Sequence, residues 1–309
     1  MRSTHSLVAF KGHTSWVYCL AFSPDGKTLA SAGWDEWIRL WDVDAKKPLT
    51  VLKGHSTEVY SLAFSPDGKT LASGSANNDN VARLWDLDNG LERFVLKGHK
   101  NVVHSVQFSA DGKELLTGSY DKTVRLWDVR KGQQTQQFTG HSEKVYAAVF
   151  SKDEKEIVAA DVTGKCRRWN VVSGNPIKAK IPSIGKRSQW VHAVAFSGDA
   201  NELATGYGYH RDKASVEGEV RVRSWDGRQL QRMRGHENFV YSVCYSPDDK
   251  LLASGGWDGK VNLWNRSTGK LEHSWSGHDG IVLGLAFSPD GKRLASTGYD
   301  QQVRIWGVS

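Results

Sequence analysis

The chain has 309 residues and a formal net charge of +7, which permits one large domain or two smaller ones and an acidic partner without requiring one. Its 13 Trp and 31 Gly against two Met favour strands joined by many turns. The first apolar run, residues 7–10, is too short for a secretory signal or a membrane span, and three widely separated cysteines argue against a disulfide framework. We therefore expect a cytoplasmic protein with no membrane partner.

From the N-terminus onward, the sequence repeats a unit that closes on a tryptophan. Each unit reads as a "GH" pair, an apolar run such as "WVYCLAFS", a turn such as "SPDGK", a second run such as "TLASAG", an Asp, and a third run such as "WIRLWD". The stretch between one "WD" and the next "GH" predicts a fourth strand. The closing residues are Trp41, Trp85, Trp127, Trp169, Trp225, Trp264 and Trp306. Because one small sheet cannot bury its own faces, this pattern predicts an all-β, seven-bladed β-propeller of four-stranded antiparallel blades.

These motifs give the chain a family resemblance over residues 1–309, which we interpret as a single domain. The order "GH", Ser or Thr, Asp and "WD" resembles the WD-repeat β-propeller family, in which these four side chains form a hydrogen-bonded tetrad in each blade. The resemblance implies five full tetrads: His13, Ser31, Asp35 and Trp41; His55, Ser73, Asp79 and Trp85; His99, Thr117, Asp121 and Trp127; His236, Ser254, Asp258 and Trp264; His278, Ser296, Asp300 and Trp306.

The same resemblance implies how the ring closes. The chain ends at the third strand of a unit, "QVRIWGVS", whereas "HSLVAF" near the start has no preceding unit of its own. Pairing the two segments would complete the last blade with the N-terminal strand and remove an exposed sheet edge.

Two kinds of chemistry compete with a structural interpretation of the polar residues. Ser, His and Asp recur five times, whereas a hydrolase needs one triad, and no "GxSxG" turn is present, so we expect no catalytic residues. His104, His192 and His210 have no tight spacing, so we expect no metal and no cofactor. An Arg two residues before most of the closing Trp residues has the period of the fold, so we interpret it as packing rather than as a nucleic-acid surface.

The resemblance also places partner binding on the top face of the ring, built from the loops that carry the tetrad His and Asp. Transferred by position, with the two extensions of unit five, the candidate partner-binding residues are Trp16, Tyr18, Trp34, Tyr60, His104, Tyr120, Lys144, Tyr146, Trp190, His192, Tyr209, Arg211, Phe239, Tyr241, Trp257 and Tyr299. Aromatic side chains are enriched at binding hot spots, although we expect about a third of these rings to pack between blades instead.

The repeat is irregular in units four and five. Unit four has Ala159 and Thr163 where other units have Ser and Asp, so its tetrad should be incomplete. Unit five lacks "GH", and its segment from Thr205 to Trp225 is longer than in other units, which predicts an inserted loop beside a second extended loop that contains Trp190. Both loops are rich in aromatic and cationic residues, as a site for an acidic group would be, but a solvated loop has the same composition.

We expect a monomeric, non-enzymatic interaction scaffold that binds a peptide or protein segment on its aromatic top face, mainly at units four to six. Two alternatives stay open. A nucleic-acid-binding propeller would stack bases on the aromatic rings and use the positive charge for phosphates. An enzyme would place its site in the top-face funnel near His104 and His192.

Overall fold

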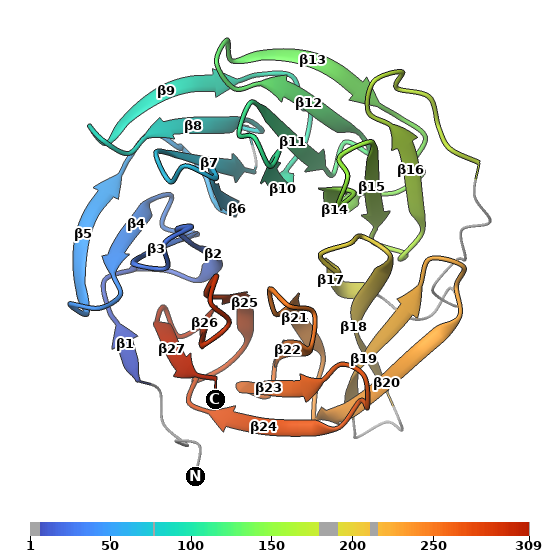
Figure 1. The fold of residues 1–309 in the computed structure, drawn as a ribbon. Coiled ribbons are helices and arrows are strands. Elements are labelled where there is room, and N and C mark those ends of the chain that lie inside the picture. The colour runs from blue at the N-terminus through green and yellow to red at the C-terminus, as the bar shows by residue number, and fades with distance from the viewer. Residues whose placement is uncertain (1–6, 77, 179–190, 211–215, 309) are drawn as a thin grey trace. The chain divides into compact units, whose positions relative to one another are not determined.

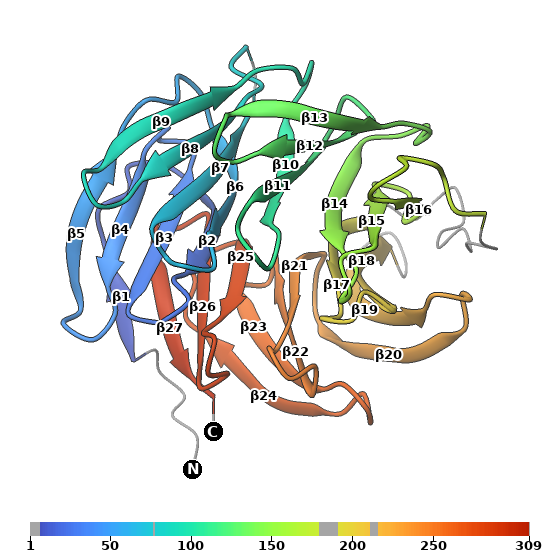
Figure 2. The same cartoon turned by 45° about the horizontal axis from the view of Figure 1, so that its top comes forward.

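The computed structural model describes residues 7–76, 78–178, 191–210 and 216–308, apart from the side chains of residues 209 and 210. The described residues form strands β1 to β27 and no helix, and the strands are arranged in seven antiparallel sheets (Figures 1 and 2). This confirms the predicted all-β fold with seven blades. The chain divides into two compact units, a first unit of residues 18–161 and 166–179 and a second unit of residues 1–17, 162–165 and 180–309.

Four sheets make up the first unit. Their strands are β2 (Val17–Phe22), β3 (Thr28–Gly33), β4 (Ile38–Asp42) and β5 (Lys47–Leu52); β6 (Val59–Phe64), β7 (Thr70–Ser75), β8 (Ala82–Asp86) and β9 (Leu91–Leu96); β10 (Val103–Phe108), β11 (Glu114–Ser119), β12 (Val124–Asp128) and β13 (Gln133–Phe138); and β14 (Val145–Phe150), β15 (Glu156–Asp161) and β16 (Cys166–Asn170). The described part of the fourth sheet has three strands, and one isolated bridge joins Trp169 to Pro176 beside β16.

Three sheets make up the second unit. Their strands are β17 (Val191–Phe196), β18 (Glu202–His210), β19 (Val216–Ser224) and β20 (Gln229–His236); β21 (Val240–Tyr245), β22 (Leu251–Gly256), β23 (Lys260–Asn265) and β24 (Leu271–Ser276); and β25 (Val282–Phe287), β26 (Arg293–Gly298) and β27 (Val303–Gly307), joined by β1 (Val8–Phe10).

The N-terminal strand completes the last sheet, as the sequence predicted. β1 runs antiparallel to β27 with Val8 opposite Ile305 and Phe10 opposite Val303. The Leu7 N–H also donates to the Ile305 carbonyl at 2.7 Å. Because Phe10 is only 4% exposed, the pairing adds apolar burial to the backbone hydrogen bonds.

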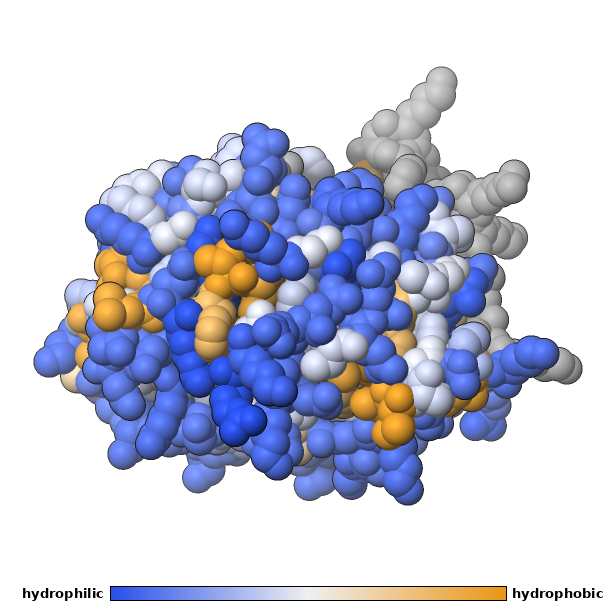
Figure 3. Space-filling model, turned by 90° about the horizontal axis from the view of Figure 1, so that it is seen from above, coloured by the Kyte–Doolittle hydropathy of each residue, from blue (hydrophilic) through white to orange (hydrophobic). Residues whose placement is uncertain are grey.

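Apolar side chains bury the faces of consecutive sheets against each other within each unit. In the first unit, Ala30, Leu40 and Leu52 of one sheet pack in one cluster with Val59 and Trp85 of the next. In the second unit, residues of β18 and β19 form a cluster with residues of β21, β22 and β23. The face drawn in Figure 3 is mostly hydrophilic, with apolar residues in small separate areas. The described residues contain no helix of the length and hydrophobicity needed to span a membrane.

A buried chain of hydrogen bonds joins the Trp, Ser, His and Asp of a sheet. In the β6–β9 sheet, Trp85 Nε1 donates to Ser73 Oγ at 2.8 Å, and Ser73 Oγ lies 2.6 Å from His55 Nε2. His55 Nδ1 lies 2.8 Å from Asp79 Oδ2. A neutral imidazole that accepts from Ser73 and donates to Asp79 satisfies every group in this chain, which matters because Ser73 is fully buried.

The same bonds recur in three further sheets, and the first sheet shows part of them. The complete sets are His99, Thr117, Asp121 and Trp127; His236, Ser254, Asp258 and Trp264; and His278, Ser296, Asp300 and Trp306. In the first sheet, Trp41 Nε1 donates to Ser31 Oγ at 2.8 Å, and Asp35 lies 3.9 Å from Arg39 Nε. His13 is buried.

The recurring arginine has a role that the sequence interpretation missed. Arg83 donates to Asp79 at 2.9 Å, and Arg39, Arg125 and Arg304 lie within 4 Å of the Asp of their own sheets. Burial opposes ionisation of Asp79, but the hydrogen bond from His55 and the charge of Arg83 outweigh it and hold the pKa of this carboxyl below its ordinary value. The arginine therefore compensates a buried carboxylate, which packing of its stem alone would not do.

The fourth sheet has a rebuilt version of the tetrad. His141 Nδ1 lies 3.0 Å from Asp161, a fully buried residue two positions before Thr163, so the carboxylate comes from another position than the motif indicates. The tetrad is incomplete, as predicted, because Ala159 has no hydroxyl. His141 Nε2 consequently has no hydrogen-bond partner among the described residues, and Trp169 Nε1 donates instead to the Thr139 carbonyl at 3.3 Å.

The fifth sheet corrects the position predicted for its closing tryptophan. Leu203 pairs with Arg223 as Leu29 pairs with Trp41, so Arg223 occupies the tetrad-Trp position and Trp225 lies two residues beyond it. The extra residues are largely strand rather than loop. β18 and β19 stay paired as far as His210 and Val216, which makes them longer than the corresponding strands of the other sheets. The "WD" motif alone did not reveal this two-residue shift.

We predict that deleting residues 1–10 destabilises the protein. The deletion removes the β1 ladder and the buried Phe10 ring, so the free energy of unfolding should fall by roughly 3 kcal/mol or more, with a lower melting temperature. A deletion of residues 1–6, which keeps the ladder, is the matched control in thermal unfolding. Equal melting temperatures for both deletions would show that the pairing adds no stability.

We also predict that Ala159→Ser stabilises the protein. The new hydroxyl would lie between His141 Nε2 and Trp169 Nε1, as Ser254 lies between His236 and Trp264, and should raise the free energy of unfolding by about 1 kcal/mol. Ser254→Ala should lower it by about 1–3 kcal/mol, because it leaves a buried imidazole nitrogen without a partner. Urea unfolding measures both changes, and a loss of stability in Ala159→Ser would contradict this account of the fourth sheet.

Candidate functional site

Several of the candidate partner-binding side chains lie at a β-bulge in the first strand of their sheet. In β6, β10 and β14 the register shifts at Tyr60, His104 and Tyr146, each of which follows a paired valine and has no partner on the neighbouring strand. A bulge adds one residue to a strand and turns its side chain away from the regular alternation. In the second unit, His192 of β17 and Tyr241 of β21 occupy the same bulge. The local fold therefore directs these side chains in the same way from sheet to sheet.

In the first unit, the rings of consecutive sheets contact one another. We call Tyr18, Tyr60, His104, Tyr120 and Tyr146 the tyrosine cluster. Tyr18 and Tyr60 stack with ring centroids 4.6 Å apart, Tyr60 is 5.9 Å from His104, and His104 stacks on Tyr120 at 5.1 Å. His104 also meets the edge of Tyr146 at 4.4 Å. Five of the predicted residues of this unit thus form one continuous row of half-buried rings.

The tyrosine cluster carries no charge near neutral pH. Burial lowers the pKa of His104 to about 4, against a partly compensating hydrogen bond between its Nδ1 and the Tyr146 carbonyl at 2.8 Å. Burial also raises the pKa values of Tyr60 and Tyr146 above their ordinary values. The cluster therefore consists of uncharged ring faces and hydroxyl groups.

Two predicted residues border this cluster and are more exposed. Trp34 is 41% exposed, and its ring lies 6.3 Å from Tyr18. The ammonium of Lys144 lies over the Tyr120 ring, 4.9 Å from its centroid. Such a cation–π contact holds the lysine chain close to the rings while its charge stays accessible.

The second unit has an aromatic cluster of its own, formed by His192, Phe239, Tyr241 and Trp257, which we call the Phe239 cluster. The His192 ring lies 5.2 Å from Phe239 and 4.9 Å from Tyr241. Trp257 lies 6.2 Å from Phe239 and is 47% exposed. Burial lowers the pKa of His192, so this cluster is also uncharged at neutral pH.

The lengthened hairpin β18–β19 contacts the Phe239 cluster through a glycine. A Cβ atom on Gly208 would lie 1.9 Å from Phe239 Cδ1, so only glycine allows the strand to approach this ring so closely. Gly208, the second glycine in "TGYGYH", is therefore required by the packing of the hairpin against Phe239. It is also a sequence signal that could have connected the inserted segment with an aromatic neighbour.

A separate pair of rings in the second unit is formed by Trp16 and Tyr299, whose ring centroids are 4.6 Å apart. Tyr299 is 45% exposed. Of the remaining candidates, Trp190 and Arg211 lie outside the described residues. For Tyr209 only the backbone is described, and it pairs with Glu217 in the hairpin.

The tetrads have the connectivity of a Ser-His-Asp triad, but their hydroxyl groups cannot reach a substrate. Ser73, Thr117, Ser254 and Ser296 are fully buried, and each also accepts a hydrogen bond from its tetrad Trp. A nucleophile needs an exposed oxygen next to its base. These groups therefore stabilise the sheets. Within the described residues, no group of three or more His, Cys, Asp or Glu side chains could hold a metal ion.

The sequence also matches known proteins. The family model for the WD domain, G-beta repeat (WD40), matches residues 4–42, 46–86, 90–128, 132–170, 227–265 and 269–307, which is most of the chain. The matches leave out residues 171–226, which contain β17, β18 and β19, three of the four strands of the irregular fifth sheet.

Short segments resemble individual proteins. The chain is 39% identical over 56 residues to eukaryotic translation initiation factor 3 subunit I of Phaeosphaeria nodorum, covering 18% of this chain and 17% of that protein. It is 50% identical over 50 residues to the antiviral protein SKI8 of Saccharomyces cerevisiae, covering 15% and 13%. It is 44% identical over 43 residues to the small ribosomal subunit protein RACK1z of Oryza sativa subsp. japonica, covering 14% and 13%. The chain thus spans less than a fifth of the length of these relatives.

The six matched repeats agree with the architecture described above. Seven antiparallel sheets, the recurring hydrogen bonds from Trp through Ser or Thr and His to Asp, and the repeat matches all concern the same residues. The chain belongs to the WD40 family of β-propeller proteins.

Proposed function

We propose that the protein is a non-enzymatic interaction scaffold, with residues 1–309 acting as one monomeric propeller, and that its aromatic clusters bind a peptide or protein segment. The observation that carries the proposal is the repeated β-bulge, which has an aromatic or imidazole ring at its extra residue in β6, β10, β14, β17 and β21. The bulge itself belongs to the repeat, because β25 has it at Leu283, so a binding surface explains the choice of rings at this position rather than the bulge.

The composition of the clusters supports a protein partner. Trp34, Trp257 and Tyr299 are each 41–47% exposed and lie at the borders of half-buried rings. Large aromatic side chains beside polar hydroxyl groups are typical of the residues that dominate binding energy at protein interfaces. Relatives named as a subunit of a translation initiation factor and as a small ribosomal subunit protein support a role in multiprotein complexes. We also propose a cytoplasmic location for this chain, where translation takes place.

Nucleic-acid binding is the second candidate, favoured by the Lys144 ammonium beside the Tyr120 ring and by the net charge of +7. Such a partner would stack its bases on the rings and pair its phosphates with cations, so its affinity would fall steeply with added salt. The uncharged rings of both clusters favour the protein partner. An enzyme with His104 as its base is a third candidate, and it would need a histidine that titrates near neutral pH.

We predict that replacing the three exposed rings reduces partner capture. The variant Trp34→Ala, Trp257→Ala, Tyr299→Ala should lose at least about tenfold in the amount of specific partner captured, because hot-spot rings each contribute about 2 kcal/mol or more. The matched control replaces three exposed apolar residues elsewhere, Leu91, Val172 and Leu271, with Ala. Quantitative affinity capture compares both with the wild type, and equal losses in the two variants would contradict the proposed surface. Melting temperatures show that both are folded.

We predict that capture does not change between about pH 6 and pH 8. The pKa of His104 in the folded protein is about 4, below the ordinary 6.5, so the ring stays neutral over this range. The unfolded chain takes up the proton first as the pH falls from 6.5, so the stability contributed by the neutral ring is lost between about pH 6.5 and pH 4. NMR titration of the imidazole signals measures the pKa. A His104 pKa near 6.5 with pH-dependent capture would instead support the enzyme alternative.

A further inference from the structure

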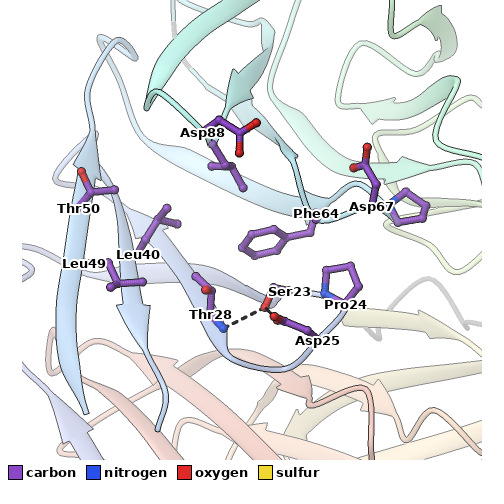
Figure 4. Close-up of a pocket in the computed structure, with 13 residues that line it drawn as sticks. Ser23, Pro24, Asp25, Thr28, Leu40, Leu49, Thr50, Phe64, Asp67 and Asp88 are labelled. Carbon is purple, nitrogen blue, oxygen red and sulfur yellow. Dashed lines mark hydrogen bonds between the residues drawn. The ribbon is translucent and has the colours of Figure 1, made fainter. Parts of the chain in front are cut away.

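A cleft lies between the first two sheets of the first unit, separate from the aromatic clusters. It has a volume of about 670 Å³ and is bordered by β4 and β5 on one side and by β6 and the segment after β8 on the other. Leu40, Leu49, Phe64 and Leu87 form its apolar lining. Figure 4 shows Phe64 directed into the space between Leu40 and Pro24.

Three carboxylates surround this apolar lining, from Asp25, Asp67 and Asp88. Among the described residues, no Lys, Arg or His lines the cleft. Asp25 and Asp67 each use Oδ1 to accept hydrogen bonds from a Ser hydroxyl and a backbone N–H of their own turn. Their Oδ2 atoms have no partner among the described residues. The cleft is thus acidic in a chain whose net charge is +7.

Three of the corresponding turns pair the aspartate with a lysine. Lys113 lies 2.8 Å from Asp111, Lys155 lies 3.7 Å from Asp153, and Lys250 lies 3.2 Å from Asp248. Lys27 and Lys69, at the same positions after Asp25 and Asp67, form no ion pair within 4 Å among the described residues, although their charges also lower the pKa values of the two carboxyls. The hydrogen bonds from Ser23 and Ser65 lower the pKa values of Asp25 and Asp67, so both are ionised at neutral pH.

The cleft differs from the corresponding cleft between the second and third sheets at two adjacent positions of β5. Thr50 pairs with Leu40 as Phe94 pairs with Leu84, so a small exposed side chain stands where the second sheet has a phenylalanine. The Phe94 ring lies against Gly132 of the following turn, where an added Cβ would be 2.6 Å from Phe94 Cδ1. Thr50 cannot cover the corresponding surface beside Leu87.

The second difference concerns charge. Leu49 stands where the second sheet has Arg93, and Arg93 lines the corresponding cleft together with Lys113 and Arg130. The neighbouring cleft therefore contains both signs of charge in its lining, whereas the cleft at Leu49 has only carboxylates.

We propose that this cleft is a second docking site, which takes a peptide segment of a partner protein with a Lys or Arg next to an apolar residue. The apolar side chain fits against Phe64, Leu40 and Leu49, and the cation lies between the carboxylates, with its aliphatic stem on the same apolar lining. β5 is the edge strand of its sheet, so an extended peptide beside it directs alternate side chains toward the cleft. An apolar lining beside three carboxylates matches this pair of side chains better than it matches a simple polyamine.

Selection of short random peptides displayed on phage against the full chain tests the proposal. Peptides that depend on the cleft should be enriched in a basic residue beside an apolar one. The selected peptides are then synthesised and their affinity for the protein is measured. The blocking variant Leu49→Arg, Thr50→Phe has the side chains of the second sheet at these positions. It should lower the affinity by at least about tenfold, because it fills the cleft and adds a cation. The double variant Asp25→Asn, Asp67→Asn should lower the peptide affinity several-fold, and added salt should lower the affinity for the wild type in the same way.

Matched variants separate the cleft from other surfaces. Leu91→Arg adds the same charge to the exposed edge strand β9, outside the cleft, and should leave peptide affinity unchanged. The triple ring variant at Trp34, Trp257 and Tyr299 should also bind these peptides normally, so the two sites succeed or fail independently. If the blocking variant is unstable by thermal unfolding, Leu49→Arg alone provides the measurement. Selected peptides without a basic residue, or with unchanged affinity for the cleft variants, would overturn the proposal.

Discussion

The structure depends on one buried interaction, the hydrogen-bond chain from the tetrad Trp through a hydroxyl and an imidazole to a carboxylate. Each group in that chain is buried in apolar surroundings, where an unsatisfied polar atom is costly. Satisfying all of them requires the loop before the first strand, the second strand and the third strand to keep one arrangement. Gly54, which precedes His55, belongs to the same constraint, because a Cβ there would lie 2.9 Å from the Trp85 ring.

The aromatic rings lie on a second feature of the repeat, the bulge of the first strand, whose extra residue carries the ring. The fifth sheet has the same bulge at His192 although its unit lacks the "GH" pair, so the bulge does not require the tetrad. His104 illustrates the result. It contacts Tyr60, Tyr120 and Tyr146, and its Nδ1 hydrogen-bonds to a carbonyl of the next sheet, so the ring is fixed from several sides.

Departures from the repeat are more informative about function than the repeat itself. The fourth sheet replaces one Asp with another from a different position and leaves His141 half-satisfied. The fifth sheet replaces a tetrad Trp position with Arg223 and lengthens its hairpin against Phe239. In the first sheet, two side chains on β5 distinguish an acidic cleft from the cleft at the corresponding position of the next sheet. In the first and fourth sheets the backbone follows the repeat and only side chains differ, whereas in the fifth sheet the hairpin itself is longer.

The sequence by itself determined the seven-sheet β fold, the tetrads and the pairing of the N-terminal segment with the last sheet. These features recur at constant spacing, and a repeated spacing reflects a repeated local geometry. Only the tertiary structure decided the partner of His141, the shift of Trp225 and the cleft beside Thr50. Asp161 and Arg223 lie two positions from where the motif places their counterparts, and cross-strand register rather than motif spacing decides which side chains meet. The cleft depends on the size of a side chain relative to a neighbouring sheet, which is a property of packing between segments that no single repeat contains.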